Sequence, residues 1–438
     1  MNKKRIYVME NLSPETIAVT FAKTSRSPEP FDEIAKGLTE EKSSKFNEKW
    51  IIGYGHSSVA EHATLSIAIE NVSRIAGEVI ESSRLASFTE KSTRYQKIDK
   101  ENFFIPGNIQ SEDFLKDYMN ICNDLVDLYS ISYERINSYF GNALNDVKKA
   151  KHIALDNARY LLPLSTLTNI GVTANARVME HMVSKMLSSN IKEVEEIGIE
   201  LKREALKRIP TLIKYASKND FIKKQNDLDK YICNASPSEI PVFREQSLPV
   251  PALLYGDFEK IDLLNKILYY AHDNRCFDDI VPDPMLDFIE KNMESHDELP
   301  RETEHLAFTF ELLIDESVYY ELKRHRMCTL SSQPHNIMNG FYIPEIFYTL
   351  SLQNEVMNII DRVKEFYIKY QHDNINVIYA LPNLTMRRVL LSSNLRELRH
   401  IYRLRNADNA HFAIRYLVKK IKEVLVSKNR SIETILNS

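Results

Sequence analysis

The strongest constraint on the fold is that this chain contains the same series of motifs twice. Motifs near the start of each copy are separated by 242 or 243 residues, and motifs near the end by 219. The matched pairs are Glu61-His62 with Glu304-His305, Arg84 with Arg326, Leu162-Pro163 with Leu381-Pro382, Asn175-x-Arg177 with Asn394-x-Arg396, and His181 with His400. Copies of roughly 200 residues are too long for a solenoid repeat and predict tandem domains.

The predicted domains cover residues 1–225 and 226–438. The stretch Lys218–Pro251 is rich in charge, Asn, Ser and Pro, so we interpret it as the linker. In the first copy, alternation at Leu65, Ile67 and Ile69 predicts a strand, and the apolar spacing from Val72 to Ile80 predicts a helix. Each copy ends in a long amphipathic helical pattern. We therefore expect an α+β module that is used twice, each a sheet flanked by long helices.

Composition narrows the functional classes. The net charge of −4 and the pI near 6.3 argue against a protein that binds nucleic-acid polymers. Four widely spaced cysteines show no metal-ligand pairing, and no long apolar run is present, so we expect a soluble, reduced, cytoplasmic protein without a metal or a membrane anchor. Neither G-x-G-x-x-G nor G-x-x-x-x-G-K-[ST] occurs, which removes support for a Rossmann or Walker site.

The stretch Arg84–Tyr95, R-L-A-S-F-T-E-K-S-T-R-Y, is the most polar motif of the first copy. It contains two arginines, one glutamate and five hydroxyl groups in twelve residues, without evident helical or strand alternation. We predict a loop whose groups suit a ligand with both phosphate charge and hydrogen-bonding edges. A solvated surface loop is the simpler alternative for such a composition.

Several ordered motifs together resemble the flavin-dependent thymidylate synthase (ThyX) family. They are G-Y-G-H-S-S-V-A-E-H at Gly53–His62, V-S-R at Val72–Arg74, Arg84–Tyr95, Leu162-Pro163 and N-A-R at Asn175–Arg177. The second copy resembles the family through Glu304-His305, R-H-R at Arg324–Arg326, N-L-R and Leu398–Arg415. The resemblance implies transfer of the methylene carbon of methylenetetrahydrofolate to C5 of dUMP and its reduction by FAD, which NADPH recharges.

The two copies depart from the family signature in complementary ways. The first has Ser82-Ser83-Arg84 in place of the R-H-R triplet and Met186 in place of a helix arginine, but keeps Glu90, Ser92, Arg94 and Arg159. The second keeps Arg324, His325, Arg326 and Arg405, with Glu321 at the position of a family glutamine, but loses the loop signature. Because family members build each nucleotide site from two subunits, we hypothesise that here the two domains share one dUMP site.

The resemblance also implies roles for individual residues. Arg94, Arg159 and Ser92 would hold the phosphate, with Glu90, Glu321 and Arg324 as further substrate contacts. Arg405 would stabilise negative charge on the pyrimidine, so Arg405, Arg94 and Ser92 form the predicted catalytic set. The predicted cofactor contacts are His56, Ser58, Glu61, Arg324, His325, Arg326, Asn175, Arg177, His181, Asn394, Arg396 and His400.

Some alternatives remain open at this stage. His62 and His305 could be core histidines, and His181 and His400 could serve packing or flavin contact. The enzyme could act at C5 of another pyrimidine nucleotide, by methylation or hydroxymethylation, or be a degenerate homologue that only binds a nucleotide. Since the family is tetrameric, a two-module chain is expected to form a homodimer.

Overall fold

The computed structural model describes residues 4–49, 57–100, 102–107, 109, 111–232, 239–258, 289, 291–294, 296–372 and 374–437. The chain divides into two compact units. Unit 1 comprises Met1–Cys122, Pro163–Ala235 and Tyr370–Ala380, and unit 2 comprises Asn123–Leu162, Ser236–Lys369 and Leu381–Ser438. Each unit contains a sheet and several helices, which confirms the predicted α+β class with two modules.

Two long segments of the chain belong to a different compact unit from the rest of their repeat. Unit 2 includes 123–162, which belongs to the first repeat, and unit 1 includes 370–380, which belongs to the second. Two of the changes of unit, after Leu162 and after Ala380, fall at or within one residue of the repeated turns Leu162-Pro163 and Leu381-Pro382. The predicted boundary after residue 225 lies within the Pro163–Ala235 segment of unit 1, and each compact unit includes chain from both repeats.

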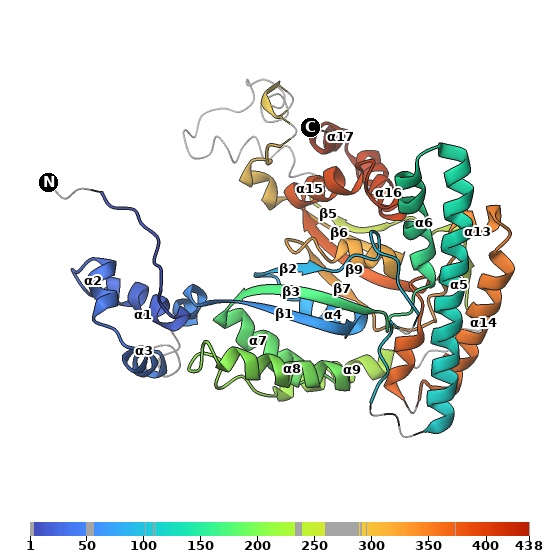
Figure 1. Cartoon of the computed structure of the whole chain (residues 1–438). Coiled ribbons are helices and arrows are strands. Elements are labelled where there is room, and N and C mark those ends of the chain that lie inside the picture. Colours follow the sequence, from blue (N-terminus) through green and yellow to red (C-terminus); the bar gives the residue numbers. More distant parts are fainter. Residues whose placement is uncertain are drawn as a thin grey trace. The chain divides into compact units, whose positions relative to one another are not determined.

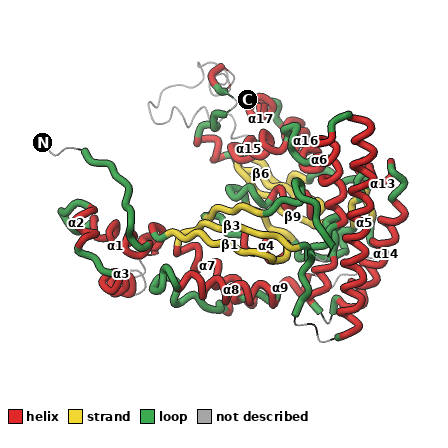
Figure 2. Tube along the Cα trace, viewed as in Figure 1, coloured by secondary structure: helices red, strands yellow, loops and turns green. Residues whose placement is uncertain are grey.

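Unit 1 is built around a three-stranded antiparallel sheet in the order β1-β3-β2. Helices α7 and α8 run along one side of β1 and β3 (Figures 1 and 2). The elements are α1 (Pro14–Thr24), α2 (Phe31–Lys36), α3 (Glu40–Phe46), η2 (Ser57–His62), β1 (Thr64–Ser73), α4 (Arg74–Glu81), β2 (Ala86–Glu90), β3 (Leu167–Asn175), α7 (Ala176–Leu187), α8 (Lys192–Leu206), α9 (Asp220–Ile232) and η7 (Ile375–Ala380).

The core of unit 1 lies between this sheet and the helices. Val172 of β3, Met182 and Met186 of α7, and Val194 and Leu201 of α8 belong to one buried cluster. The long amphipathic pattern at the end of the repeat therefore forms two helices, since the chain turns between Leu187 and Lys192. The predicted linker Lys218–Pro251 is also partly regular, because it contains α9.

The prediction that Arg84–Tyr95 is entirely a loop is wrong. Residues Ala86–Glu90 form β2, which pairs with β3 in the register Ala86↔Ala174 to Glu90↔Ile170. Ala86, Phe88 and Glu90 are more buried than the exposed Ser87 and Thr89 between them. Inward-facing and outward-facing residues do alternate in this strand. The pattern is hard to see in the sequence because one inward-facing residue is a glutamate instead of an apolar residue.

Unit 2 contains a four-stranded sheet in the order β5-β6-β9-β7 and a short parallel pair β4-β8. Its elements are α6 (Val147–Ala158), η3 (Arg159–Leu161), β4 (Val242–Phe243), η4 (Glu245–Ser247), β5 (Ala252–Gly256), η6 (Arg301–His305), β6 (Ala307–Asp315), α12 (Glu316–Leu322), β7 (Thr329–Ser332), β8 (Phe341–Tyr342), α13 (Glu345–Thr349), β9 (Met386–Asn394), α15 (Leu395–Arg405), α16 (Phe412–Lys428) and α17 (Ser431–Asn437).

The core of unit 2 joins the long strands β6 and β9 to the C-terminal helices. Phe308 and Phe310 of β6, Leu391 of β9, Leu398 of α15 and Ile414 of α16 are buried in one cluster. Strand β6 thus presents the apolar residues that alternate in sequence, as the repeat predicted. The final amphipathic pattern again forms separate helices, α15 and α16, rather than one.

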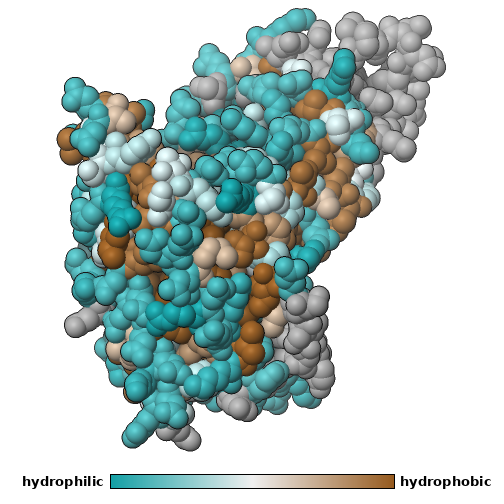
Figure 3. Space-filling view, turned by 90° about the vertical axis from the view of Figure 1, so that its right-hand side faces the viewer, coloured by the Kyte–Doolittle hydropathy of each residue, from teal (hydrophilic) through white to brown (hydrophobic). Residues whose placement is uncertain are grey.

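Two further helices are long. Helix α5 covers Glu112–Leu144 and α14 covers Gln353–Tyr370. Ile131 and Tyr139 of α5 are 48% and 45% exposed. On the face in Figure 3, apolar patches lie between hydrophilic side chains. Within the described part of the chain, no helix combines the length and the apolar character that spanning a bilayer requires.

Candidate functional site

In unit 2, the carboxylate of Glu321 lies between two arginines. Arg405 Nη1 donates to Glu321 Oε2 at 2.8 Å, and Arg159 Nη1 lies 3.6 Å from Glu321 Oε1. A further bond joins Arg405 Nη2 to the backbone oxygen of Glu321 at 2.8 Å. The side chains of Arg159 and Glu321 are almost completely buried. Arg159 comes from the first repeat and the other two from the second, so both repeats contribute to this cluster.

Arg159 has one edge of its guanidinium group without a protein partner. Its Nε and Nη2 atoms are buried and have no hydrogen-bond partner among the described residues. These two nitrogens share an edge and form the fork that binds an oxyanion through two parallel hydrogen bonds. Buried N–H groups without an acceptor are costly, so this edge is suited to an anionic ligand.

Two hydrogen bonds from the segment Asn383–Leu384 fix the backbone around Arg159. Arg159 begins η3 directly after α6, and its carbonyl oxygen accepts a bond from Asn383 Nδ2 at 2.8 Å. The next residue, Tyr160, accepts a bond at its carbonyl from the amide of Leu384 at 3.0 Å. Asn383 and Leu384 of unit 2 thus fix the backbone position of Arg159 and Tyr160.

His325 lies between Arg405 and Glu397 in this cluster and is neutral. Its Nε2 accepts a bond from Arg405 Nε at 2.8 Å, and its Nδ1 lies 3.3 Å from Glu397 Oε1. Acceptance at Nε2 requires the proton on Nδ1, which then donates to Glu397. Burial lowers the pKa of His325, and the charge of Arg405 lowers it further, whereas Glu397 acts in the opposite direction. The imidazole therefore positions Arg405 without adding charge.

Asp315 brings a second buried carboxyl near Arg159. It is the N-cap of α12 and accepts a bond from the amide of Val318 at 3.0 Å. Burial raises the pKa of Asp315 to about 7, although the hydrogen bond from Val318 and the charge of Arg159 oppose the rise. Near neutral pH this group therefore changes charge within the buried part of unit 2.

The other predicted residues of the second repeat have more varied positions. Arg324 is exposed and Arg326 is half-buried in the turn between α12 and β7, while His325 between them is buried. Asn394 is the N-cap of α15 and accepts a bond from the amide of Glu397 at 2.9 Å. His400 contacts the His325 ring edge-on, with the ring centroids 5.8 Å apart.

The loop set of the first repeat lies in unit 1. Glu90 Oε1 is 3.2 Å from Arg74 Nη1, and both side chains are buried. Ser92 Oγ accepts a bond from the amide of Arg94 at 3.2 Å, which stabilises the turn after β2. Arg94 itself is buried in this turn. Glu90, Ser92 and Arg94 therefore belong to unit 1, whereas Arg159, Glu321 and Arg405 belong to unit 2.

The predicted cofactor residues of the first repeat lie on the surface of unit 1. Ser58 and Glu61 are on η2, and Glu61 Oε1 forms an ion pair with Arg177 Nη1 at 2.6 Å. Asn175 is the N-cap of α7, and His181 is exposed on that helix. His56 lies outside the described residues.

The interpretation of His62 and His305 as core histidines is wrong. Both are exposed at the ends of 3-10 helices that come just before the first long strand of each unit. His62 nevertheless contacts the ring of Phe21 edge-on, with the centroids 4.9 Å apart.

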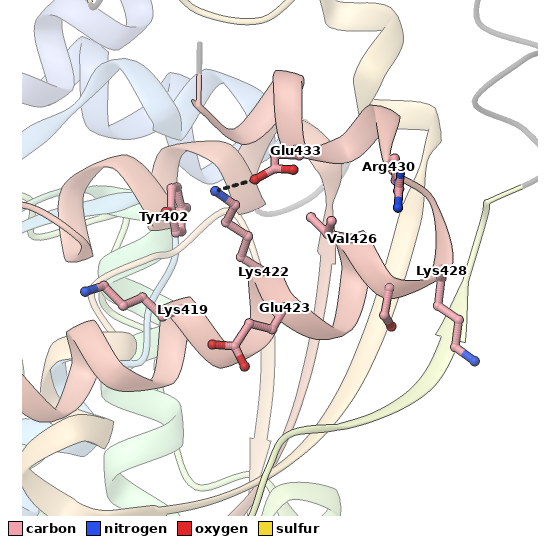
Figure 4. A pocket seen from close by; sticks show the side chains of 9 residues that line it. Tyr402, Lys419, Lys422, Glu423, Val426, Lys428, Arg430 and Glu433 are labelled. Atoms are coloured by element: carbon pink, nitrogen blue, oxygen red, sulfur yellow. Dashed lines mark ion pairs between the residues drawn. The ribbon is translucent and has the colours of Figure 1, made fainter.

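The described residues also line cavities to which the arginine cluster does not contribute. One, of about 720 Å³, lies between α16 and α17 and is lined by charged side chains of both signs. Figure 4 shows Lys422 pointing toward Glu433 there, at a distance of 3.6 Å. The second, of about 760 Å³, is in unit 1 and is lined in part by Phe21, Ser58 and His62. Ser58 is one of the predicted cofactor residues.

Sequence reasoning assigned no site role to four buried polar residues. Arg74 pairs with Glu90, Glu397 bonds to His325, and Glu193 accepts bonds from Ser73 Oγ at 2.6 Å and from Tyr379 OH at 2.7 Å. Asp315 is the fourth. The pattern Asn394-x-x-Glu397 at a helix start is a recognisable capping signal and could have located Glu397.

The class of protein follows from these features. Buried arginines that are oriented by carboxylates, with one guanidinium edge open to a partner, are the elements of a site for an anionic ligand. The same α+β module occurs twice in the chain, and unit 2 contains the arginine cluster.

The family can be stated more closely. The model of the thymidylate synthase complementing protein family matches residues 7–211 and 253–428, and the chain belongs to this family. The chain is 26% identical to a UPF0159 protein of Thermoplasma acidophilum, over 91% of this chain and 89% of the relative. It is 30% identical to the flavin-dependent thymidylate synthase of Clostridium tetani, over 47% of this chain and 82% of that protein.

The match in two segments, and a relative that aligns with about half of the chain, agree with the two modules. Among solved structures, the chain is similar to flavin-dependent thymidylate synthase ThyX from Helicobacter pylori, which was crystallised with FAD and dUMP. The identity is 19%, with a TM-score of 0.34, over 48% of this chain and 98% of that one.

Proposed function

We propose that this chain is a flavin-dependent enzyme that transfers a one-carbon unit from methylenetetrahydrofolate to C5 of dUMP and reduces it to give dTMP. The observation that carries the proposal is the buried Nε and Nη2 edge of Arg159, which has no partner among the described residues. The phosphate of a nucleotide is a suitable partner for that edge. Membership of the family and the names of its flavin-dependent relatives support the reaction.

Arg405 is proposed to bind the pyrimidine. Its guanidinium is oriented by Glu321 and by neutral His325, so little reorganisation is needed when a ligand arrives. Carbon 5 of uracil becomes nucleophilic as negative charge develops on the ring carbonyl groups, and a nearby fixed cation stabilises that charge. Ser92 and Arg94 remain in the predicted catalytic set on the basis of the family signature.

The cofactor, proposed to be FAD, supplies the hydride and is recharged by NADPH. Arg324 and Arg326 fit a pyrophosphate because they present positive charge on an accessible turn. Asn175 and Asn394 contribute by starting helices α7 and α15, from which Arg177 and Arg396 project. His325 has both ring nitrogens engaged within the protein, so its contribution to the cofactor would be indirect.

Calorimetric titration of the purified full chain with dUMP tests the binding step. Arg159→Ala should weaken dUMP binding at least tenfold, because a charge-assisted pair contributes about 1.5–3 kcal/mol. Arg362→Ala is the matched control, since Arg362 forms an exposed ion pair with Asp124 in the same unit. Equal dUMP affinity in the wild type and Arg159→Ala would contradict the assignment.

Turnover with FAD, NADPH and labelled methylenetetrahydrofolate tests the reaction. Incorporation of the label into dTMP is the expected outcome. Label in a product of dCMP but not of dUMP would instead identify another pyrimidine nucleotide as the substrate. Binding of dUMP without any labelled product would favour a homologue that has kept the site and lost the reaction.

The assembly is proposed to be a homodimer, by analogy with the four modules of the family's tetramer. Light scattering of the purified protein distinguishes a dimer from a monomer or a larger assembly.

A further inference from the structure

Glu321 occupies an unusual position for a residue in an anion site. Its two carboxylate oxygens face different arginines, with Oε2 at 2.8 Å from Arg405 and Oε1 at 3.6 Å from Arg159. The side chain is 4% exposed, so water screens these charges weakly. Glu321 is thus an anion built into the same cluster of arginines that a ligand's anionic group would use.

We propose that Glu321 is an internal counter-anion that limits the affinity of this site for anionic ligands. Its carboxylate keeps the guanidinium groups of Arg159 and Arg405 in place before the ligand binds. An anionic group at the open Nε and Nη2 edge of Arg159 then shares that cation with Glu321. Glu321 is therefore a specificity-determining residue, because it penalises ligands in proportion to their negative charge.

The balance of charges in the cluster explains the effect. Arg159 and Arg405 supply two positive charges, Glu321 and Glu397 supply two negative charges, and His325 is neutral. Asp315, near Arg159, adds a further negative charge when it is deprotonated. A dianionic phosphate therefore enters a cluster without excess positive charge. Water screens charges weakly in this buried site, so the carboxylate of Glu321 and the negative charge of a bound anion repel each other. Removing the charge of Glu321 should thus improve anion binding by about tenfold or more.

The test compares Glu321→Gln with the wild type and with Glu321→Asp. Glutamine keeps the shape and an oxygen acceptor for Arg405 Nη1 but removes the charge, whereas aspartate keeps the charge on a shorter side chain. Glu423→Gln is the matched control, because Glu423 forms an exposed ion pair with Lys420 in the same unit. Calorimetry with inorganic phosphate and with dUMP gives the affinities, and a thermal melt identifies any variant that fails to fold.

The expected result is about tenfold or greater tightening of phosphate and dUMP binding in Glu321→Gln alone. Unchanged or weaker binding of both ligands in a folded Glu321→Gln protein would overturn the inference, since Glu321 would then support the site instead of competing. The inference rests on the proposed function only for the identity of the nucleotide. If phosphate binding tightens and dUMP binds to no variant, the proposed function fails while the role of Glu321 holds.

Discussion

Arg177 Nη1 lies 2.6 Å from Glu61 Oε1 in unit 1, and the same pair recurs in unit 2, where 2.8 Å separates Arg396 Nη1 from Glu304 Oε1. In both units the arginine lies two residues after an asparagine that caps a helix, and the glutamate is the penultimate residue of a 3-10 helix before the first long strand. The repeat in the sequence is therefore a repeat of specific contacts. Because the Glu61 pair is largely solvent-exposed, it contributes about 1 kcal/mol or less to stability.

We expect Arg177→Ala to lower the FAD content of the purified protein with little loss of stability. Arg177 is in the predicted cofactor set, and its exposed ion pair with Glu61 adds little to folding. Flavin absorbance per chain and the midpoint of chemical unfolding are the two measurements. Arg203→Ala is the control, since Arg203 pairs with Glu200 at an exposed site in the same unit. Full flavin content in Arg177→Ala would remove Arg177 from the cofactor set.

The ion pair between Arg405 and Glu321 in unit 2 should contribute more to stability than the exposed pair of Arg177 and Glu61. Arg405→Ala leaves the Glu321 carboxylate with fewer partners in a buried site, which should reduce the free energy of unfolding by about 3 kcal/mol or more. The double variant Arg405→Ala, Glu321→Gln should lose less than the sum of the single losses, because no uncompensated charge remains. Urea unfolding of the four proteins measures this coupling. Strict additivity would mean that the two side chains do not interact.

The pKa of Asp315 leads to a prediction about pH. Burial raises this pKa from its ordinary value of 3.8 to about 7, so the folded protein binds a proton that the unfolded chain releases between those values. The contribution of this group to stability is therefore fully present below pH 3.8 and is lost as the pH rises through 7. The loss is on the order of 4 kcal/mol at pH 8, from about 1.4 kcal/mol for each unit of pKa.

Asp315→Asn should remove this dependence while keeping the helix cap, since asparagine caps helices as well as aspartate. Urea unfolding of the wild type and the variant between pH 4 and pH 8 measures the slope. Asp146→Asn alters the exposed N-cap of α6 and is the control. The same slope in the wild type and in Asp315→Asn would show that Asp315 does not hold the proton.

How far the sequence predicts this structure depends on how far apart in the sequence the contacting residues lie. The strand at Leu65–Ile69, the following helix and the family were predictable, because alternation, helical spacing and ordered motifs are local signals. The N-caps at Asn175 and Asn394 were also readable, although we interpreted those residues as cofactor contacts. Strand β2 was missed because Glu90, an inward-facing residue, is a charged group buried beside Arg74.

The contacts of the arginine cluster were not predictable in the same way. Arg159 and Glu321 were both proposed from motifs, but no local pattern places one beside the other. Their contact depends on 123–162 belonging to unit 2, and sequence similarity between the repeats gives no indication of that exchange. Tyr379 and Glu193 meet in unit 1 through the corresponding exchange of 370–380.

Tyr379→Phe should destabilise the protein by about 1–3 kcal/mol, because Glu193 would lose a buried hydrogen bond of 2.7 Å. Burial already raises the pKa of Glu193, and the bonds from Ser73 and Tyr379 oppose that rise. Tyr160→Phe is the control, since the Tyr160 hydroxyl is buried and has no hydrogen-bond partner among the described residues. Its removal should leave stability unchanged or increase it. Equal effects of the two substitutions would mean that the Glu193 bond is not formed in solution.

The complementary losses in the two repeats predict the number of nucleotides per chain. Only the first repeat keeps Glu90, Ser92 and Arg94, and only the second keeps the triplet and Arg405. If a dUMP site requires both sets of residues, one chain can form only one such site. Calorimetry should then find one dUMP per chain. Arg94→Ala and Arg405→Ala should each weaken that single binding event at least tenfold.

Met186→Leu tests the opposite combination, in which the first repeat would supply the helix position and the second repeat the loop. Met186 stands where the family has the helix arginine. Met186 is buried in the core of unit 1 beneath the sheet, so a substitution of similar volume should leave dUMP binding unchanged. Two dUMP sites per chain, or binding that depends on Met186 and not on Arg94 or Arg405, would contradict the complementary division. One site that responds to both arginines would mean that the two repeats have specialised, since neither repeat retains the whole set.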